Sequence, residues 1–404
     1  ITLLNNVSQS IGATGTGSII LNHASSQVND QGYSGHLHTI GQNVSISGFG
    51  TVTTLTGTSF FDNLGAISAN QSGQTLNLTR VNNSALATLE AINGATLDLN
   101  GVWNNAGTIT ATDSTLTMVG TTSWTNTGTI SVLGSIPANG STLTTAGTWN
   151  NSGLLEVRDT SIVNLGGTFT TLDFESIQRD VTTITSNLTG ALNNAADVLT
   201  LDATTGNLNF INGTISGGTI TDDGAGRYNF STGNGTFDSL VLDTDILVQD
   251  NRSLYVTNGI DFGVSTPTIT LGGTGSGSLR LSGNANNSIG ATGTGSIVLA
   301  HTSSRIDDDG YASLTHTIGA NVSISGFGSI ASNAASSFIN NLGDISADQT
   351  GQTLALTRVV TNTGGIFESI NGASLALNAG SLANDGTINV GPASFINTSN
   401  ASLT

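Results

Sequence analysis

A seven-residue motif that recurs at a nearly fixed spacing is the feature that most constrains the fold. Trp103, Trp124 and Trp149 each begin one copy, and an Asn, a Gly and an Ile or Leu follow two, four and six positions later. Successive Trp residues are 21 and 25 positions apart (124 − 103 and 149 − 124). Every second residue of a strand points to the same face, so these four side chains share one side. Short strands repeated at this period predict a solenoid.

The Asn of this motif has a physical reason to lie inside such a solenoid. Stacked coils repeat at about 4.8 Å, so identical side chains form a ladder along the axis. An inward Asn can bond the next Asn and the turn backbone, which satisfies polar groups that are buried. Seven motif copies predict a structural Asn ladder of Asn63, Asn105, Asn126, Asn151, Asn341, Asn362 and Asn384.

The fold class follows from these two observations. We predict an all-β protein, a single elongated right-handed parallel β-helix with coils of about 21 residues. The Trp, Asn, Gly and Ile positions face its core, and the Thr, Ser and Asn residues between them face solvent. Helix signals are nearly absent, and the strongest is the short stretch 190–197. The Gly-rich stretch 265–300 is flanked by strand patterns, so it predicts tight corners of the same solenoid rather than a linker.

A duplication spans most of the chain. Residues 10–100 are equivalent to residues 288–378, with 54 of 91 positions identical at an offset of 278 (288 − 10). We therefore interpret 10–287 as one full 278-residue repeat unit, 288–404 as a partial second unit, and 1–404 as one continuous β-solenoid. A unit of that length corresponds to roughly 13 coils and ~60 Å of axial rise.

Composition excludes some functions. Charged residues are 8% of the chain, against roughly 25% in an average globular protein, and there is no Cys and no Lys. The net charge is −18 and the pI is about 4.1. Nucleic acids and anionic membranes select clustered Lys and Arg, so neither is an expected partner. No apolar run reaches the length of a membrane span, so the chain is not expected to cross a membrane.

Several stretches resemble a known class of protein. They are 212–220 (Asn-Gly-Thr-Ile-Ser-Gly-Gly-Thr-Ile), 252–259, 270–277 and the Asn-x-Gly-Thr-Ile coils. They resemble giant bacterial cell-surface tandem-repeat β-solenoid proteins, similar in character to filamentous-haemagglutinin-type adhesins. Because both ends of the sequence continue the internal pattern, we expect a segment of a longer protein or a mature product.

The resemblance implies a non-catalytic, structural or adhesive role outside the cell, on the bacterial surface. It implies a fibre, filament or sheath-like layer built from end-to-end repeats and lateral association. The expected partners are neighbouring copies of the protein itself, surface polysaccharide, or a host or neighbouring cell surface.

An enzyme is the alternative. Parallel β-helices include pectin-lyase-like enzymes that act on polysaccharides outside the cell, and these gather acidic side chains and Arg in one external groove. The Glu residues of this chain are scattered along the sequence, so no catalytic residue is assigned. They are Glu90, Glu156, Glu175 and Glu368. An external groove holding two or more carboxylates with Arg would favour the enzyme.

Two patterns raise the possibility of a metal. Asp307, Asp308 and Asp309 are adjacent, and carboxylates suit calcium, which is the only cofactor considered. Ordinary Asp-Gly turn chemistry explains the same pattern and is favoured over calcium. His36 and His38 have the spacing to ligate a metal from one strand face. The second copy keeps only the equivalent of His38, so we interpret these histidines as surface residues of a turn region.

Overall fold

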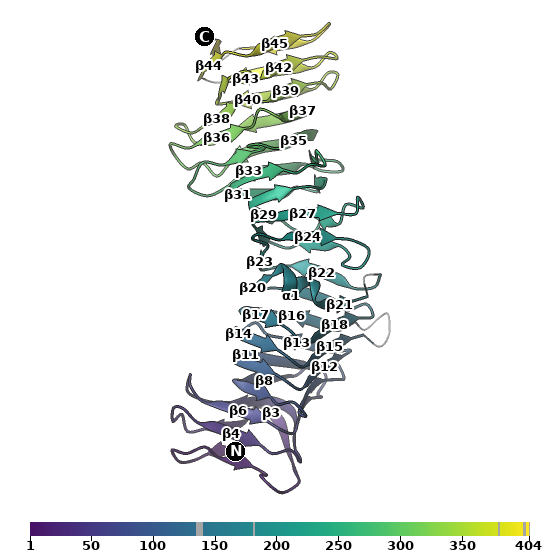
Figure 1. The fold of residues 1–404 in the computed structure, drawn as a ribbon, viewed down its shortest axis with the longest axis vertical. Coiled ribbons are helices and arrows are strands. Elements are labelled where there is room, and N and C mark those ends of the chain that lie inside the picture. The colour runs from purple at the N-terminus through teal and green to yellow at the C-terminus, as the bar shows by residue number, and fades with distance from the viewer. Residues whose placement is uncertain (135–139, 181, 379, 399–400, 404) are drawn as a thin grey trace. The chain divides into compact units, whose positions relative to one another are not determined.

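The computed structural model describes residues 1–134, 140–180, 182–378, 380–398 and 401–403. About 57% of the residues lie in strands, and parallel strands stack as a β-solenoid of about 16 turns with about 22 residues per turn (Figure 1). The predicted all-β, parallel β-helix class is confirmed. Contacts divide the chain into two compact units, Ile1–Ala191 with Thr204–Gly206, and Leu192–Ala203 with Asn207–Thr404. The continuity of one solenoid from 1 to 404 stays a prediction.

Each regular coil of the first unit contains three short strands. One coil is formed by β14 (Thr121–Asn126), β15 (Thr129–Leu133) and β16 (Thr142–Thr144). The next coil pairs with it in parallel through β17 (Thr148–Asn151), β18 (Leu154–Arg158) and β19 (Ile162–Leu165). The register sets Trp124 beside Trp149 and Asn126 beside Asn151, which is the alignment that the motif predicts.

Aromatic stacking fills one corner of this core. The rings of Trp103 and Trp124 are 5.1 Å apart, those of Trp124 and Trp149 are 5.2 Å apart, and Phe169 continues the stack at 4.6 Å. All four side chains are buried. Each indole N–H is satisfied, since it donates to the Thr121 hydroxyl, the Ala146 carbonyl or the Gly166 carbonyl respectively. Stacked strands at coil spacing thus hold identical rings face to face.

The Gly of the motif is required by close approach between coils. A Cβ at Gly128 would lie 2.2 Å from the Gly107 carbonyl oxygen, and a Cβ at Gly153 would lie 2.2 Å from the Gly128 carbonyl oxygen. These separations leave no room for any side chain. The Gly column therefore lets the turn of one coil rest on the backbone of the coil before it.

The single described helix lies outside the region where the sequence suggested one. It is α1 (Thr171–Glu175), which begins with a capping box in which Thr170 and Asp173 bond each other's backbone N–H groups. The stretch 190–197, which holds the strongest of the few helix signals in the sequence, instead contains the strand β23 (Ala191–Asn193). The capping pair, rather than average helix propensity, is the local signal that starts α1.

The second unit continues the same architecture. The strands β29 (Gly235–Leu242), β31 (Arg252–Phe262) and β35 (Gly295–Asp308) are long, while β30 (Ile246–Val248), β32 (Thr268–Leu271) and β33 (Gly277–Leu281) are short. Gly272 and Gly273, with φ of 112° and 149°, form the corner between β32 and β33. The Gly-rich stretch is therefore part of the solenoid, as predicted.

The duplicated segments have matching strands. In the first copy these include β3 (Gly17–Asp30), β4 (Leu37–Ile40) and β5 (Val44–Thr53). Their equivalents are β35, β36 (Thr315–Ile318) and β37 (Val322–Ala331), and each begins and ends 278 residues later. In the described part of the chain, no helix is long and apolar enough to cross a membrane.

Candidate functional site

The Asn residues of the motif form a continuous hydrogen-bonded column in the first unit. The side-chain amide of Asn105 donates to Asn126 Oδ1 at 2.7 Å, and that of Asn126 donates to Asn151 Oδ1 at 2.7 Å. Each amide also donates to a carbonyl of the next turn, as Asn126 does to Leu154 at 3.0 Å. Asn105 and Asn126 are almost fully buried. The column ends where Asn151 donates to the hydroxyl of Ser176 at 2.8 Å.

Asn83 belongs to the same column although the motif search missed it. It accepts from Asn63 at 3.0 Å and donates to Asn105 at 2.8 Å. Asn83 pairs in register with Asn105 of the next coil. Three residues separate Asn83 from Ala87, which occupies the place of the motif Gly. A search that allowed a turn of variable length after the Asn would have found it.

A second column lies in the second unit. Asn341 donates to Asn362 Oδ1 at 3.0 Å, and Asn362 donates to Asn384 Oδ1 at 2.8 Å. A register shift after Ile339 brings Asn362, rather than the residue 278 positions after Asn83, opposite Asn341. All seven Asn residues of the motif thus lie in one of two columns of buried or partly buried amides.

The three adjacent aspartates do not converge. Strand alternation sends Asp307 and Asp309 to one face of β35 and Asp308 to the other. Asp307 accepts two bonds from the Arg280 guanidinium, at 2.9 and 3.0 Å, and pairs with Arg305 Nε at 2.9 Å. Asp309 is exposed and lies 3.9 Å from Arg280. The pKa of Arg280 is raised, chiefly because its guanidinium bonds Asp307.

Asp308 serves the backbone of the turns instead. Its Oδ1 accepts the N–H groups of Gly310 and Asn333 at 3.0 and 2.8 Å, and its Oδ2 accepts the Ser332 hydroxyl at 2.6 Å. The carboxylates of Asp307, Asp308 and Asp309, considered as calcium ligands, therefore bond separate partners, and the bonds of Asp308 are of the turn type that the sequence favours. Among the described residues, no three His, Asp or Glu side chains are grouped so as to hold a metal ion.

A buried His beside an Asp recurs in both copies. His38 Nε2 lies 3.5 Å from Asp30 Oδ2, and His316 Nε2 lies 3.7 Å from Asp308 Oδ2. Both residues are at most 1% exposed, so the interpretation of these two residues as surface histidines is wrong. They are buried because each is the first inward-facing residue of its strand. His38 pairs in register with Phe61 of the next coil, and His316 pairs with Ile339.

The protonation of these histidines is biased by burial. Each Nδ1 accepts a backbone N–H, from Gln9 at 3.3 Å and from Asn287 at 3.1 Å, so in the neutral ring Nε2 carries the proton and faces the carboxylate. Desolvation lowers the pKa of both His38 and His316 below the usual value, against the opposing pull of Asp30 and Asp308. The pair holds turns together, because Asp30 also accepts the N–H groups of Gly32 and Leu55.

The Glu side chains remain dispersed in the structure. Glu90 and Glu156 lie in one strand column, but the register places Thr110 and Ser131 on the two coils between them. Glu156 bonds the Ser131 hydroxyl and Arg158, and these bonds lower its pKa. This arrangement does not provide a facing pair of carboxylates.

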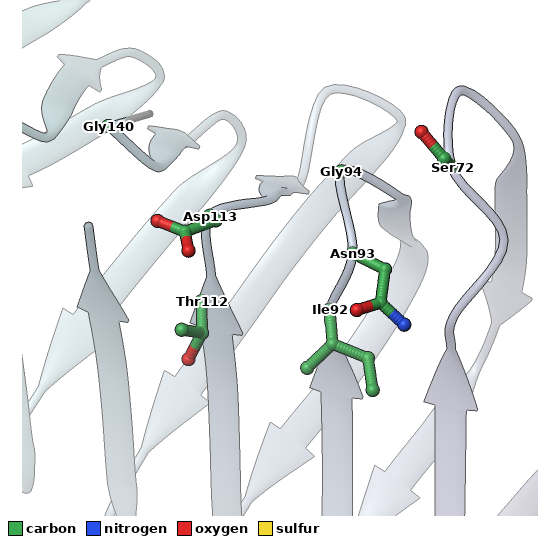
Figure 2. Close-up of a pocket in the computed structure, with 7 residues that line it drawn as sticks. All are labelled: Ser72, Ile92, Asn93, Gly94, Thr112, Asp113 and Gly140. Carbon is green, nitrogen blue, oxygen red and sulfur yellow. The ribbon is translucent and has the colours of Figure 1, made fainter. Parts of the chain in front are cut away.

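A polar groove of about 750 Å³ follows the turns of four successive coils in the first unit. Figure 2 shows Ser72, Asn93 and Asp113 on neighbouring turns, next to the ends of their strands. Gly94, Ile92, Thr112 and Gly140 complete the lining. Hydroxyl, amide and carboxylate groups of this kind can bond the hydroxyls of a sugar chain. The described residues of the groove include one carboxylate and no Arg, which falls short of the two carboxylates with Arg that would favour an enzyme.

The comparisons with known proteins give no relative. No family model, no curated protein and no solved structure matches the chain.

Proposed function

We propose that this chain is a non-catalytic structural or adhesive segment of a very large secreted protein of the bacterial cell surface. In this proposal the repeats continue end to end and associate laterally into a fibre, a filament or a sheath-like layer. The partners are neighbouring copies of the protein, with surface polysaccharide or another cell's surface as a further ligand. No resident cofactor is part of the proposal.

The observation that carries the proposal is the matching of strands between the two copies. Strands β3, β4 and β5 recur 278 residues later with the same lengths, so the same outward positions recur along the chain. A lateral contact made by one copy can therefore be made again by the other. Repeated weak contacts add up through effective concentration, which is how a long repeat protein adheres without a deep binding site.

The chemistry of the polar side chains supports the same proposal. The buried Asn columns and the Arg280–Asp307 pair form hydrogen bonds within the chain. The side chains of the two His–Asp pairs lie 3.5 and 3.7 Å apart within the chain, so all of these polar groups hold coils together. An acidic surface, with 26 Asp and Glu against 8 Arg, would keep such a protein soluble until a specific contact forms.

Electron micrographs of the native material test the proposal. Long thin fibres or a layer with an axial repeat near ~60 Å are expected, the rise of roughly 13 coils at strand spacing. Compact globular particles would contradict it.

A polysaccharide-acting β-helix enzyme is the second candidate, because the polar groove could bond the hydroxyls of a sugar chain, although it lacks the paired carboxylates with Arg. Asp113 is the acidic side chain of that groove, and Ser72 and Asn93 lie on the adjacent turns. Incubation with acidic and neutral polysaccharides, followed by measurement of new reducing ends and of unsaturated products, tests this candidate. Product formation that is lost in Asp113→Asn but kept in Asp62→Asn, a carboxylate on another strand, would favour the enzyme and reject the structural role.

A further inference from the structure

Two exposed tyrosines occupy the same place in the two copies. Tyr33 is 43% exposed, and Tyr311, which lies 278 positions later (311 − 33), is 48% exposed. Of the Trp, Phe and Tyr residues that the structure describes, only Phe395 is exposed besides these two, and it lies outside the duplicated segments. Tyr228, by contrast, is buried and its hydroxyl bonds two backbone carbonyl groups. An exposed aromatic ring is therefore an exception in this chain, and it recurs once in each copy.

Each tyrosine lies on a loop that has a coil on either side. The coil before the Tyr311 loop bonds it where the Gly283 N–H donates to Asp309 Oδ2 at 3.3 Å. The coil after it bonds the loop where the Ser336 hydroxyl accepts a backbone N–H at 3.2 Å. The Tyr33 loop is likewise bonded to the coil before it and to the coil after it. The fold of the loop thus exposes the ring, although neighbouring coils cover both sides of the loop.

The backbone of each loop is fixed at the tyrosine itself. The Ser59 hydroxyl donates to the Tyr33 carbonyl at 2.8 Å, and the Ser337 hydroxyl donates to the Tyr311 carbonyl. The glycine before each tyrosine, with a φ of 80° or 79°, donates its N–H at 3.0 Å to the aspartate two positions earlier. A ring carried on a fixed backbone loses less freedom on binding, which lowers the entropic cost of a contact.

The tyrosine is kept while the residues around it change. Residues 31–37 and 309–315 share only the Gly and the Tyr. On the turn of the next coil, residues 54–59 and 332–337 share only the Ser that bonds the tyrosine carbonyl. The positive φ explains the Gly and the hydrogen bond explains the Ser. Packing does not explain the Tyr, because its side chain is exposed in both copies.

The kept feature is an aromatic ring in polar surroundings. Leu37 and Leu55 are exposed beside the Tyr33 loop, but their counterparts in the second copy are Thr315 and Asn333. A purely apolar partner would lose contact area through these two changes. A pyranose sugar would not, because its C–H groups match the negative face of an aromatic ring and its hydroxyls bond polar side chains.

Two other classes of partner fit the site less well. Organic cations are held by cages of several aromatic rings. Among the described residues, neither loop has a second exposed Trp, Phe or Tyr beside it. Nucleic acid bases also stack on tyrosine, but a chain with a net charge of −18 repels their phosphates. An uncharged sugar meets neither obstacle.

We propose that Tyr33 and Tyr311 are the contact residues of two equivalent carbohydrate sites, one in each copy. At each site the exposed ring stacks on a neutral hexopyranose of a polysaccharide, and polar groups of the loop and of the next turn bond its hydroxyls. Each site is shallow and weak, so binding increases with the number of sites in the chain. The inference rests on the adhesive part of the proposed function and names its ligand class and its contact residues.

Binding to immobilised dextran, mannan and galactan, three neutral hexose polymers, tests the proposal. The 404-residue protein is expected to bind at least one of them, and Y33A/Y311A should bind that polymer about tenfold more weakly or worse. Y33F/Y311F keeps both rings and should bind within about twofold of the parent. The matched control L37T/L55N changes exposed residues beside Tyr33 to those of the second copy, and it should leave binding unchanged. Thermal unfolding midpoints should be the same in all four proteins.

Nitration of the parent protein by tetranitromethane, read by peptide mass spectrometry, checks the sites without any variant. The bound polymer should slow nitration of Tyr33 and Tyr311. The partly exposed Tyr255 should react at an unchanged rate, and the buried Tyr228 should stay unmodified.

Equal binding by the parent and Y33A/Y311A would overturn the proposal, as would no binding of the parent to any of the three polymers. A loss of self-association in Y33A/Y311A, measured by sedimentation, with polymer binding unchanged would also overturn it, because a second copy would then be the occupant. Fibres in micrographs together with unchanged polymer binding by Y33A/Y311A would reject these sites and leave the structural proposal standing. Compact particles that bind a polymer through the two tyrosines would reject the fibre and leave the sites standing.

Discussion

The two copies of the duplicated segment share a core and differ at their surfaces. Gly48 and Gly326 occupy the same tight position, Asp30 and Asp308 accept the same turn N–H groups, and Asn63 and Asn341 begin the two Asn columns. These are the positions at which a change would disturb the stacking of coils. Inward residues are therefore constrained by the neighbouring coil, while the outward residues are kept at some positions, such as Ser45 and Ser323, and changed at others.

The clearest difference is a group of four charges in and just before the second copy, which the first copy and the residues just before it lack. Arg280, Arg305, Asp307 and Asp309 occupy the places of Thr2, Gln27, Asn29 and Gln31, so two positive and two negative charges replace four neutral polar residues. The second copy bonds them together, with Asp307 between the two guanidinium groups. The coordinated replacement indicates that a buried charge at this site is tolerated only with its partners.

The largest expected effect tests the shared core. Gly48→Ala and Gly326→Ala should each destabilise their coil by about 3 kcal/mol or more. The backbone at both positions has a positive φ that strains Ala, and the added Cβ would collide with the neighbouring coil. The added Cβ would lie 1.8 Å from the Leu21 oxygen and 2.0 Å from the Leu299 oxygen, at φ of 111° and 109°. Native-state hydrogen exchange of β5 and β37 measures this local loss.

Gly73→Ala and Gly351→Ala are the matched controls, because their added Cβ meets no atom within 4 Å. They should cost only about 1–2 kcal/mol, the penalty of a left-handed conformation. If the Ala variants at positions 48 and 326 lose no more stability than those at 73 and 351, contact between coils does not constrain the core.

The next effect tests the charge group. Arg280→Thr removes the two-bond partner of a carboxylate that is 6% exposed, and it should destabilise by about 2–3 kcal/mol. The fourfold variant R280T/R305Q/D307N/D309Q restores the residues of the first copy, so it should stay within about 1 kcal/mol of the parent. Thermal unfolding of both variants is the measurement. If the fourfold variant is less stable than R280T, the four charges together stabilise the fold and do more than compensate one another.

The Asn columns give an effect of similar or smaller size. Asn63→Leu, Asn126→Leu and Asn341→Leu should each cost ~1–3 kcal/mol, because turn carbonyls and a neighbouring amide lose their partners. Of the two equivalent positions, Asn63→Leu should cost more stability than Asn341→Leu. Asn63 Oδ1 also accepts the Gly65 N–H at 3.1 Å, whereas Asn341 Oδ1 has no hydrogen-bond partner. Asn150→Thr, an exposed position beside the column, is the control for shifts in unfolding midpoint. Unchanged midpoints in the three Leu variants would contradict a structural ladder.

The smallest effect concerns pH. The pKa of His38 is lowered first by burial and also by the neighbouring charge of His36, whereas Leu314 occupies that place beside His316. His36→Leu should therefore raise the pKa of His38 and leave that of His316 unchanged, as measured by NMR titration. Because both folded-state pKa values lie below the unfolded value near 6.5, the unfolded chain binds protons first. Stability should then fall as pH drops below about 6.5, and a rise in stability over that range would contradict the assignment.

The sequence alone determined the fold class, the inward face and most of the Asn columns. Those conclusions depend on side-chain alternation and on a repeat spacing, both of which are local properties visible in the chain. The motif predicted Trp124 beside Trp149 and Asn126 beside Asn151, and the register agrees. It missed Asn83, where a longer turn interrupts the spacing, and the strongest helix signal of the sequence lay at 190–197 although the helix forms at 171–175.

Only the tertiary structure decided what the charged and titratable residues contact. Asp307 and Asp308 are adjacent in sequence, yet one bonds Arg280 in the preceding coil and the other bonds Ser332 in the following coil. His38 becomes a core residue because the coils on either side of it exclude water. Burial in a solenoid is a property of stacking, which a strand's own sequence does not contain.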